Sequence, residues 1–161
     1  MRMRSSPSHI KVINSNKFFS LNVKFIESIA IKVLKSLKKD KVSEVDIVFM
    51  DDAAIKKLNK RYKNVDSPTD VLSFAIDGRE FKRREVLGEI FISLDTARRN
   101  SKLFDVDFEH EIVRYVVHGI LHLFDYDDQS KVEKARMWHR QEKLLGELCK
   151  QETLSKVLTR R

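Results

Sequence analysis

The sequence predicts an α+β domain in which a small mixed β-sheet of about four strands packs with about five helices. Strand-like and helix-like segments follow one another in the order β-α-β-α-β-β-α-α-α. The 161 residues include only 4 Gly and 2 Pro, which favours regular elements over long loops. Hydrophobic residues make up 42% of the chain, so a single packed core is possible.

Hydrophobic periodicity defines the elements of the first half. Residues 9–14 alternate apolar and polar side chains, as in a short half-buried strand. Residues 22–38 repeat apolar side chains at the 3.6-residue period of an amphipathic helix. A buried strand is expected over residues 45–50. Asp51 and Asp52 then follow as residues that can cap a second helix.

Pro68 places the end of that second helix upstream, because the residue before a proline avoids helical backbone angles. Two further strands are expected over residues 71–76 and 87–93, joined by a charged loop around residues 78–85. The second half of the chain is helical. Its helices are predicted over residues 95–101, 108–124 and 132–148.

The chain divides into one domain and two short ends. Residues 1–8 are interpreted as a flexible basic leader, and residues 9–150 as the domain itself. Residues 151–161 show no clear core contribution, so we expect a basic C-terminal tail.

Charge and cysteine content narrow the possible environments and partners. The net charge of +8 favours a polyanionic partner such as nucleic acid. Cys149 is the single cysteine, which excludes an intramolecular disulfide and a cysteine-rich zinc site. The N-terminus has no apolar segment typical of a secretory signal, and no apolar run approaches the ~20 residues that span a bilayer. We therefore expect a cytoplasmic protein without a membrane partner.

The sharpest chemical feature is a pair of histidines, His118 and His122, on the helix predicted over residues 108–124. Side chains four residues apart on a helix lie one turn above each other and point the same way. Both imidazoles can therefore reach one ion at ~2.0–2.1 Å. A carboxylate beyond the helix end can be the third ligand, which leaves a fourth position open as in catalytic zinc sites.

Asp128 is the preferred third ligand. Its spacing of ten residues from His118 is that of the third ligand in zinc proteases of the HExxHxxGxxH type, so we expect a zincin-like metal helix. Asp125 and Asp127 are the alternative ligands. Gly119 occupies the position of the protease general base, which disfavours peptide hydrolysis; close packing or room beside the metal can explain the glycine.

The motif VVHGILHLFDYDD resembles the HGxLHLxGYDH signature of the YbeY family. Upstream, LNKRYKNVDSPTDVLSFAI at residues 58–76 is similar to the family segment LNxxYRxxDxPTDVLSFP, and LGEIFIS at residues 87–93 is similar to LGDIxIS. The resemblance covers residues from about 45 to 148 in the family's order. It implies a zinc-dependent endoribonuclease that acts on ribosomal RNA, in small-subunit 3′-end maturation and in ribosome quality control.

Three positions depart from the family pattern. The third histidine falls on Asp128, so the resemblance implies a His₂Asp site for one zinc ion. Asp125 replaces the glycine of the family's GYD turn. The family's functional arginine falls on Lys63, which keeps the positive charge but loses the bidentate fork. Arg61, two residues earlier, can substitute, so Lys63 and Arg61 are the candidate catalytic cations.

Two other functions remain open. One is a non-catalytic factor for ribosomal RNA processing or ribosome assembly, whose zinc is structural; the changes at Lys63 and Asp128 favour it. The other is a metalloprotease, which Gly119 disfavours. In both ribosomal functions the expected partners are ribosomal RNA and the ribosome or its small subunit.

Several further residues have both a structural and a functional interpretation. Thr69, Asp70 and Ser73 can position a phosphate or water near Lys63, or simply order the turn after the proline. Trp138 and Phe104 are interpreted as packing residues rather than base-stacking platforms. On the two-histidine helix, His110 and Arg114 can support the metal ligands, although solvent-facing positions are the more common outcome for such residues.

Overall fold

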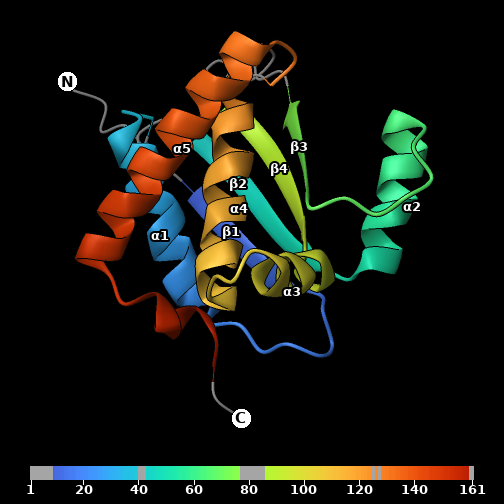
Figure 1. Ribbon diagram of the computed structural model, residues 1–161, viewed down its shortest axis with the longest axis horizontal. Helices are drawn as coiled ribbons and strands as arrows, with labels where there is room; N and C mark the ends of the chain where they lie inside the picture. Colours follow the sequence, from blue (N-terminus) through green and yellow to red (C-terminus); the bar gives the residue numbers. More distant parts are fainter. Residues whose placement is uncertain (1–8, 40–42, 77–85, 125, 127, 160–161) are drawn as a thin grey trace, which may run out of the picture.

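The protein is described by a computed structural model over residues 9–39, 43–76, 86–124, 126 and 128–159. At its centre is a four-stranded sheet in the spatial order β1-β2-β4-β3 (Figure 1). The strands are β1 (His9–Asn14), β2 (Ser43–Met50), β3 (Val71–Ile76) and β4 (Val86–Ser93). Each predicted strand is confirmed within two residues at either end.

The sheet is mixed, as predicted. β1 pairs with β2 and β2 pairs with β4 in parallel, whereas β3 runs antiparallel to β4 at the edge. The helix α1 connects β1 to β2, because parallel neighbours need a crossover connection. Because β4 lies between β2 and β3, β3 is the antiparallel edge strand. β3 also contacts the helix that carries the two histidines.

The helices begin where the sequence provides capping residues. The side chain of Asn22 accepts a hydrogen bond from the backbone N–H of Phe25, and that of Asp51 accepts one from Ala54. α2 stops at Asn64, whose left-handed backbone closes the helix. The helices are α1 (Val23–Ser36), α2 (Asp52–Lys63), α3 (Leu94–Leu103), α4 (Phe108–Leu123), α5 (Lys131–Gln151) and the short 3₁₀ helix η2 (Leu154–Val157).

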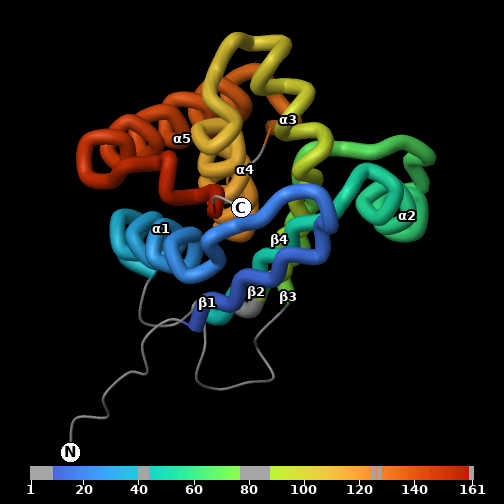
Figure 2. Tube along the Cα trace, turned by 90° about the horizontal axis from the view of Figure 1, so that it is seen from below, coloured from blue at the N-terminus to red at the C-terminus, as the bar shows by residue number. Residues whose placement is uncertain are grey.

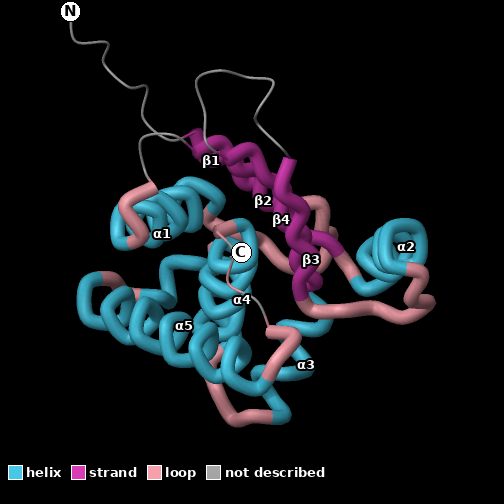
Figure 3. Tube along the Cα trace, turned by 90° about the horizontal axis from the view of Figure 1, so that it is seen from above, coloured by secondary structure: helices cyan, strands magenta, loops and turns pink. Residues whose placement is uncertain are grey.

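The two faces of the sheet are covered by different helices. Figures 2 and 3 show α1, α4 and α5 on one side of the strands and α2 alone on the other. Because side chains alternate along a strand, Ile47 and Phe49 of β2 enter the main core, whereas Val48 and Met50 join a smaller cluster with Ile55 of α2. α4 therefore packs on the face of the sheet that forms the main core.

The interpretation that residues 151–161 make no clear contribution to the core is wrong. Val157 of η2 is fully buried in the main core, and its carbonyl accepts a hydrogen bond from Asn22 N at 2.8 Å. Leu158 forms an isolated antiparallel bridge with Leu21. A short apolar segment lacks the periodicity that reveals a longer element, so this packing was not predictable from the sequence.

The basic leader over residues 1–8 and the charged loop over residues 78–85 remain expectations, because these residues lie outside the described part of the chain. Across the described ranges, none of the helices combines the length and the apolar character needed to cross a membrane.

Candidate metal centre

Close packing of α4 on the sheet fixes the position of the two histidines. A Cβ atom at Gly119 would lie 2.5 Å from Cγ2 of Ile90 on β4, a distance that real Cβ atoms do not tolerate. Ser73 on β3 donates a hydrogen bond to the Gly119 carbonyl at 3.0 Å. The glycine is therefore explained by close packing of the helix against the sheet.

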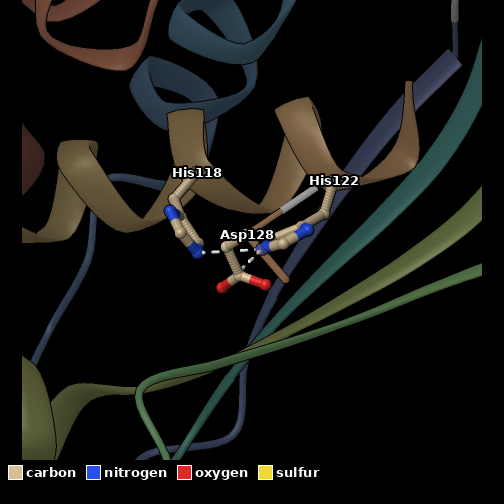
Figure 4. A group of neighbouring side chains, drawn as sticks. All are labelled: His118, His122 and Asp128. Atoms are coloured by element: carbon tan, nitrogen blue, oxygen red, sulfur yellow. Dashed lines mark hydrogen bonds and ion pairs between the residues drawn. The ribbon is translucent and has the colours of Figure 1, made fainter. Parts of the chain in front are cut away.

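His118, His122 and Asp128 converge on one point (Figure 4). The Nε2 atoms of the two imidazoles are 3.1 Å apart, and Nε2 of His122 lies 3.9 Å from Oδ2 of Asp128. The candidate ligand atoms of the three residues all lie within 4.8 Å of one another. The structure thus brings together the three residues that the sequence analysis selected as ligands.

These separations suit one tetrahedral zinc ion. With Zn–N bonds of ~2.0–2.1 Å and tetrahedral angles, two ligand nitrogens lie ~3.3–3.4 Å apart. The observed 3.1 Å between the imidazole nitrogens is close to that value, whereas the 3.9 Å between His122 Nε2 and Oδ2 of the half-exposed Asp128 is longer. A zinc ion held by these two imidazoles and one carboxylate would keep one coordination position open.

Gln141 on α5 orients the first imidazole. Its Oε1 lies 2.7 Å from Nδ1 of His118, and its Nε2 donates to Oε1 of Glu142 at 3.3 Å. Because the amide group gives its N–H to Glu142, its carbonyl faces the histidine, and Nδ1 of His118 is the donor. The proton on Nδ1 leaves the lone pair of Nε2 directed at the candidate metal position.

The surroundings of His122 also favour the neutral imidazole, which can bind a metal. Burial and then the neighbouring His118 lower its pKa, while Asp128 and a backbone hydrogen bond to Tyr126 act in the opposite direction. The lowered pKa favours the neutral imidazole, which is the form that binds a metal. Since Nε2 of His122 faces His118, Nδ1 is the nitrogen left for the backbone of Tyr126. Two lone pairs therefore face each other, and one cation satisfies both.

Comparison with known proteins identifies the relationship. The family model described as Endoribonuclease YbeY matches residues 11–149. The chain belongs to the YbeY family. A relative named Endoribonuclease YbeY from Persephonella marina is 38% identical over 119 residues, which cover 73% of this chain and 77% of the relative. Another from Sulfurihydrogenibium sp. is 32% identical over 149 residues, covering 91% and 97%.

The fold agrees with this assignment. The solution structure of TM1509 from Thermotoga maritima matches with a TM-score of 0.62 and 27% sequence identity, over 88% of this chain and 90% of that chain. Some other YbeY relatives match over less of their own length, down to 56%. The resemblance seen in the sequence motifs is therefore confirmed, and so is the predicted α+β fold.

The candidate catalytic cations of this YbeY chain lie at the C-terminal end of α2. Lys63 is exposed, and its charge is among the influences that lower the pKa of His122, so its ammonium group is within electrostatic range of the histidine pair. Arg61 is also exposed, and its guanidinium lies 5.3 Å from the ring centroid of Tyr62. Lys63 is thus linked electrostatically to the candidate ligands, and Arg61 is held against a neighbouring ring.

The segment after Pro68 has mainly structural contacts. Oδ1 of Asp70 accepts hydrogen bonds from the backbone of Val71 at 2.7 Å and from the Thr69 hydroxyl at 3.2 Å. The Asp70 carbonyl accepts from Ser93 N at 2.9 Å. These contacts, with that of Ser73 to α4, support the interpretation that the segment orders the turn and the edge of the sheet.

Arg114 and His110, two further residues selected from the sequence, have different surroundings. Arg114 binds Glu111 and Glu142, so it supports Gln141 through Glu142 and is not a solvent-facing residue. His110 instead lies 3.7 Å from the sulfur of Cys149. The alternative ligands Asp125 and Asp127 lie outside the described residues.

Sequence reasoning did not identify Gln141, and it misjudged two aromatic residues. Gln141 lies 23 residues from His118 on another helix, and no motif connects them. Trp138 and Phe104 were expected to be packing residues, yet their side chains are largely exposed. Both lie in helix or cap positions whose periodicity does not distinguish a packed aromatic side chain from an exposed one.

Proposed function

We propose that this YbeY chain is a zinc-dependent endoribonuclease that acts on single-stranded ribosomal RNA, in small-subunit 3′-end maturation and ribosome quality control. The observation that carries the proposal is the convergence of His118, His122 and Asp128 within 4.8 Å, with both imidazoles presenting Nε2 to one point. Membership of the YbeY family and the endoribonuclease name of its relatives support the choice of RNA as substrate.

The ligand set fits zinc better than magnesium or calcium, because imidazole nitrogen suits zinc and the other two ions prefer oxygen ligands. When bound, zinc supplies Lewis acidity and a hydrolytic nucleophile at neutral pH. Asp128 contributes a negative charge that partly offsets the charge of the cation. Gln141 holds the proton on Nδ1 of His118, so that Nε2 stays available as a ligand throughout turnover.

The chain's cations are suited to a phosphodiester substrate. Lys63, with or without Arg61, neutralises the negative charge that develops on the phosphorus oxygens in the transition state. The lysines of α2 are exposed. Two of them form surface ion pairs with the Asp66 carboxylate, at Nζ–O distances of 3.9 Å for Lys56 and 3.7 Å for Lys60. A strand of RNA that follows this helix meets positive charge before it reaches the metal position.

The rival function is a ribosome-associated factor that binds RNA without cutting it. The replacement of the family's arginine by Lys63 and of its third histidine by Asp128 favours this rival, because both changes weaken the electrostatic stabilisation of a transition state. In that case the zinc ion only stabilises the fold. A protease function is not supported, because Gly119 leaves no general base at the required position.

Metal analysis tests the first part of the proposal. Untagged protein should contain about one zinc per chain, and His122→Ala should lose it. His139→Ala, a change of an exposed histidine on α5, should leave the zinc content unchanged. Wild-type protein that cannot bind zinc would overturn both zinc-dependent functions.

Cleavage of a single-stranded RNA then distinguishes the enzyme from the binding factor. We expect cleavage that stops on chelation, returns with added zinc and is abolished in His118→Ala. Binding of the RNA without cleavage by zinc-loaded protein would support the binding factor and overturn the nuclease proposal. Cleavage that persists after both chelation and His118→Ala would identify a contaminating nuclease and would not count as activity of this chain.

A further inference from the structure

A pocket of about 360 Å³ adjoins the candidate metal centre, between the ligands and the first half of α5. His118 and Asp128 form its inner side, and Gln141 lines it next to His118. Its accessible wall is mainly nonpolar and includes Met137 and Trp138. The volume falls within the ~300–1,000 Å³ of sites that hold small organic groups.

One face of α5 lines the outer part of this pocket. Lys131, Lys134, Ala135 and Trp138 are spaced three, four and seven residues from the first, so they lie on one side of the helix. All four are exposed. Within the part of the chain that the structure describes, neither lysine ammonium takes part in an ion pair. The pocket thus combines an apolar wall with two available cations.

Trp138 is exposed and yet held in place. The residue is 57% exposed, an unusual degree for the only tryptophan of the chain. The guanidinium of Arg114 lies 6.0 Å from the ring centroid, and Arg114 is itself fixed by ion pairs to Glu111 and Glu142. An aromatic ring oriented by a fixed cation loses little freedom when a second flat group stacks against it.

We propose that this pocket binds a nucleobase of the RNA substrate next to the phosphate that is cut, with the base stacked on Trp138 and the adjoining phosphate held by Lys131 and Lys134. The proposal rests on the proposed nuclease function and adds a subsite to it. A nucleobase has a flat π-face that suits the indole, and its chain carries the anions that suit the lysines. An apolar peptide would use the wall but leave both ammonium groups without a partner.

The position of the pocket also determines where the RNA substrate lies relative to the candidate metal ligands. His118 lines the pocket and is a candidate metal ligand, so a base held there lies about one nucleotide from the metal position. Stacking on an aromatic side chain tolerates every base, so the pocket selects an unpaired nucleotide rather than a sequence. The requirement for single-stranded RNA would then arise from the need for a free base.

The single tryptophan makes the test direct. A short oligoadenylate should quench Trp138 fluorescence in a saturable manner, both in zinc-loaded protein and in the presence of chelator. The same ribose-phosphate chain without bases should bind more weakly and leave the fluorescence unchanged. Equal quenching by the base-free chain, or quenching by an apolar peptide but not by RNA, would overturn the proposal.

Matched variants measure the contribution of each group through the anisotropy of labelled oligoadenylate. Trp138→Ala should weaken binding about tenfold or more, whereas Trp138→Phe, which keeps a ring, should stay within about threefold of wild type. Lys134→Ala should also reduce the slope of log affinity against log salt by roughly 0.7. Lys143→Ala, about two and a half turns away on the opposite side of α5, should leave that slope unchanged.

The outcomes separate this proposal from the proposed function. Quenching by oligoadenylate without RNA cleavage would support the base pocket and contradict the nuclease function. Cleavage of RNA with an unchanged KM in Trp138→Ala and no fluorescence change would retain the nuclease and overturn the pocket.

Discussion

Oε1 of Gln141 lies 2.7 Å from Nδ1 of His118, so a residue on α5 fixes the orientation of a candidate metal ligand on α4. Gln141 is only 3% exposed, and its amide also donates to Glu142, which Arg114 binds in turn. The geometry of the candidate metal centre therefore depends on the packing of two helices. A side chain that binds no metal itself determines which imidazole nitrogen is free to do so.

Gln141→Leu should lower zinc affinity by about 10–100-fold, the usual effect of removing a hydrogen-bond partner from a ligating histidine. Leucine fills similar space but cannot accept the Nδ1 proton, so His118 loses its fixed tautomer and orientation. Competition against a zinc chelator of known affinity measures the effect. Gln151→Leu, at the exposed end of α5, is the control and should bind as wild type does. An unchanged affinity in Gln141→Leu would show that His118 needs no such support.

Gly119→Ala should lower the free energy of unfolding by about 1–3 kcal/mol, the typical cost of overpacking. The added methyl group would lie 2.5 Å from Cγ2 of the fully buried Ile90, so either the Ile90 side chain or α4 must shift. The intrinsic helix preference of alanine offsets up to ~1 kcal/mol of this cost. Denaturant titration of the metal-free protein measures the change.

Gly146→Ala provides a matched control within α5. A Cβ atom there has no neighbour within 4 Å, so the substitution should raise the free energy of unfolding by up to ~1 kcal/mol through helix preference alone. Opposite signs for the two glycines would show that packing on the sheet, rather than backbone freedom, requires Gly119. Equal effects at both positions would refute that explanation.

The elements were predictable because each strand and most helices have a regular apolar period. The alternation in β1 and the apolar stripe in α1 depend only on residues that are close in the sequence, so both can be recognised without the structure. The order β1-β2-β4-β3 was not predictable, because strand pairing depends on contacts between segments that are distant in the sequence. The sequence indicated a mixed sheet but not which strand lies at the centre.

The candidate metal ligands were predictable for the same reason, since His118 and His122 lie one turn apart on one helix. Gln141 and the exposure of Trp138 were not, because both follow from how α5 packs against α4. Along α5, the pattern that buries Met137 leaves the next residue at the edge of the buried stripe, where packing decides between burial and exposure. Contacts between different helices, such as that of Gln141 with His118, can be identified only from the structure.

The carboxylate of Asp52 joins three elements and should produce a measurable pH dependence. Burial acts to raise the pKa of Asp52, but hydrogen bonds from Arg99, Ser93 and Thr96 outweigh it and lower the pKa. A lowered folded-state pKa means that the interaction stabilises the fold above the unfolded pKa of ~3.9, and that this stabilisation is lost as pH falls through the folded value.

Arg99→Ala should therefore lower the free energy of unfolding by up to ~1 kcal/mol at neutral pH, the range of partly exposed ion pairs. The difference from wild type should disappear at a pH well below 3.9, where Asp52 is protonated in both proteins. Urea titrations across this pH range measure it, with Lys57→Ala on α2 as the control for an exposed cation. A difference that stays constant down to low pH would show that Arg99 acts through packing alone.

The sequence resemblance places the family's arginine at Lys63, which makes exchange at this site informative. Lys63→Ala should lower kcat for RNA cleavage on the order of 10²-fold, the usual effect of removing one group that stabilises transition-state charge. Lys63→Arg should raise kcat, because the guanidinium fork can hold two phosphate oxygens at once. Arg61→Lys keeps the charge two residues away and should change kcat by less than about threefold if Lys63 is the principal cation. A larger loss in Arg61→Lys than in Lys63→Ala would assign the catalytic charge to Arg61, because only the residue that contacts the scissile phosphate is sensitive to the geometry of its donors.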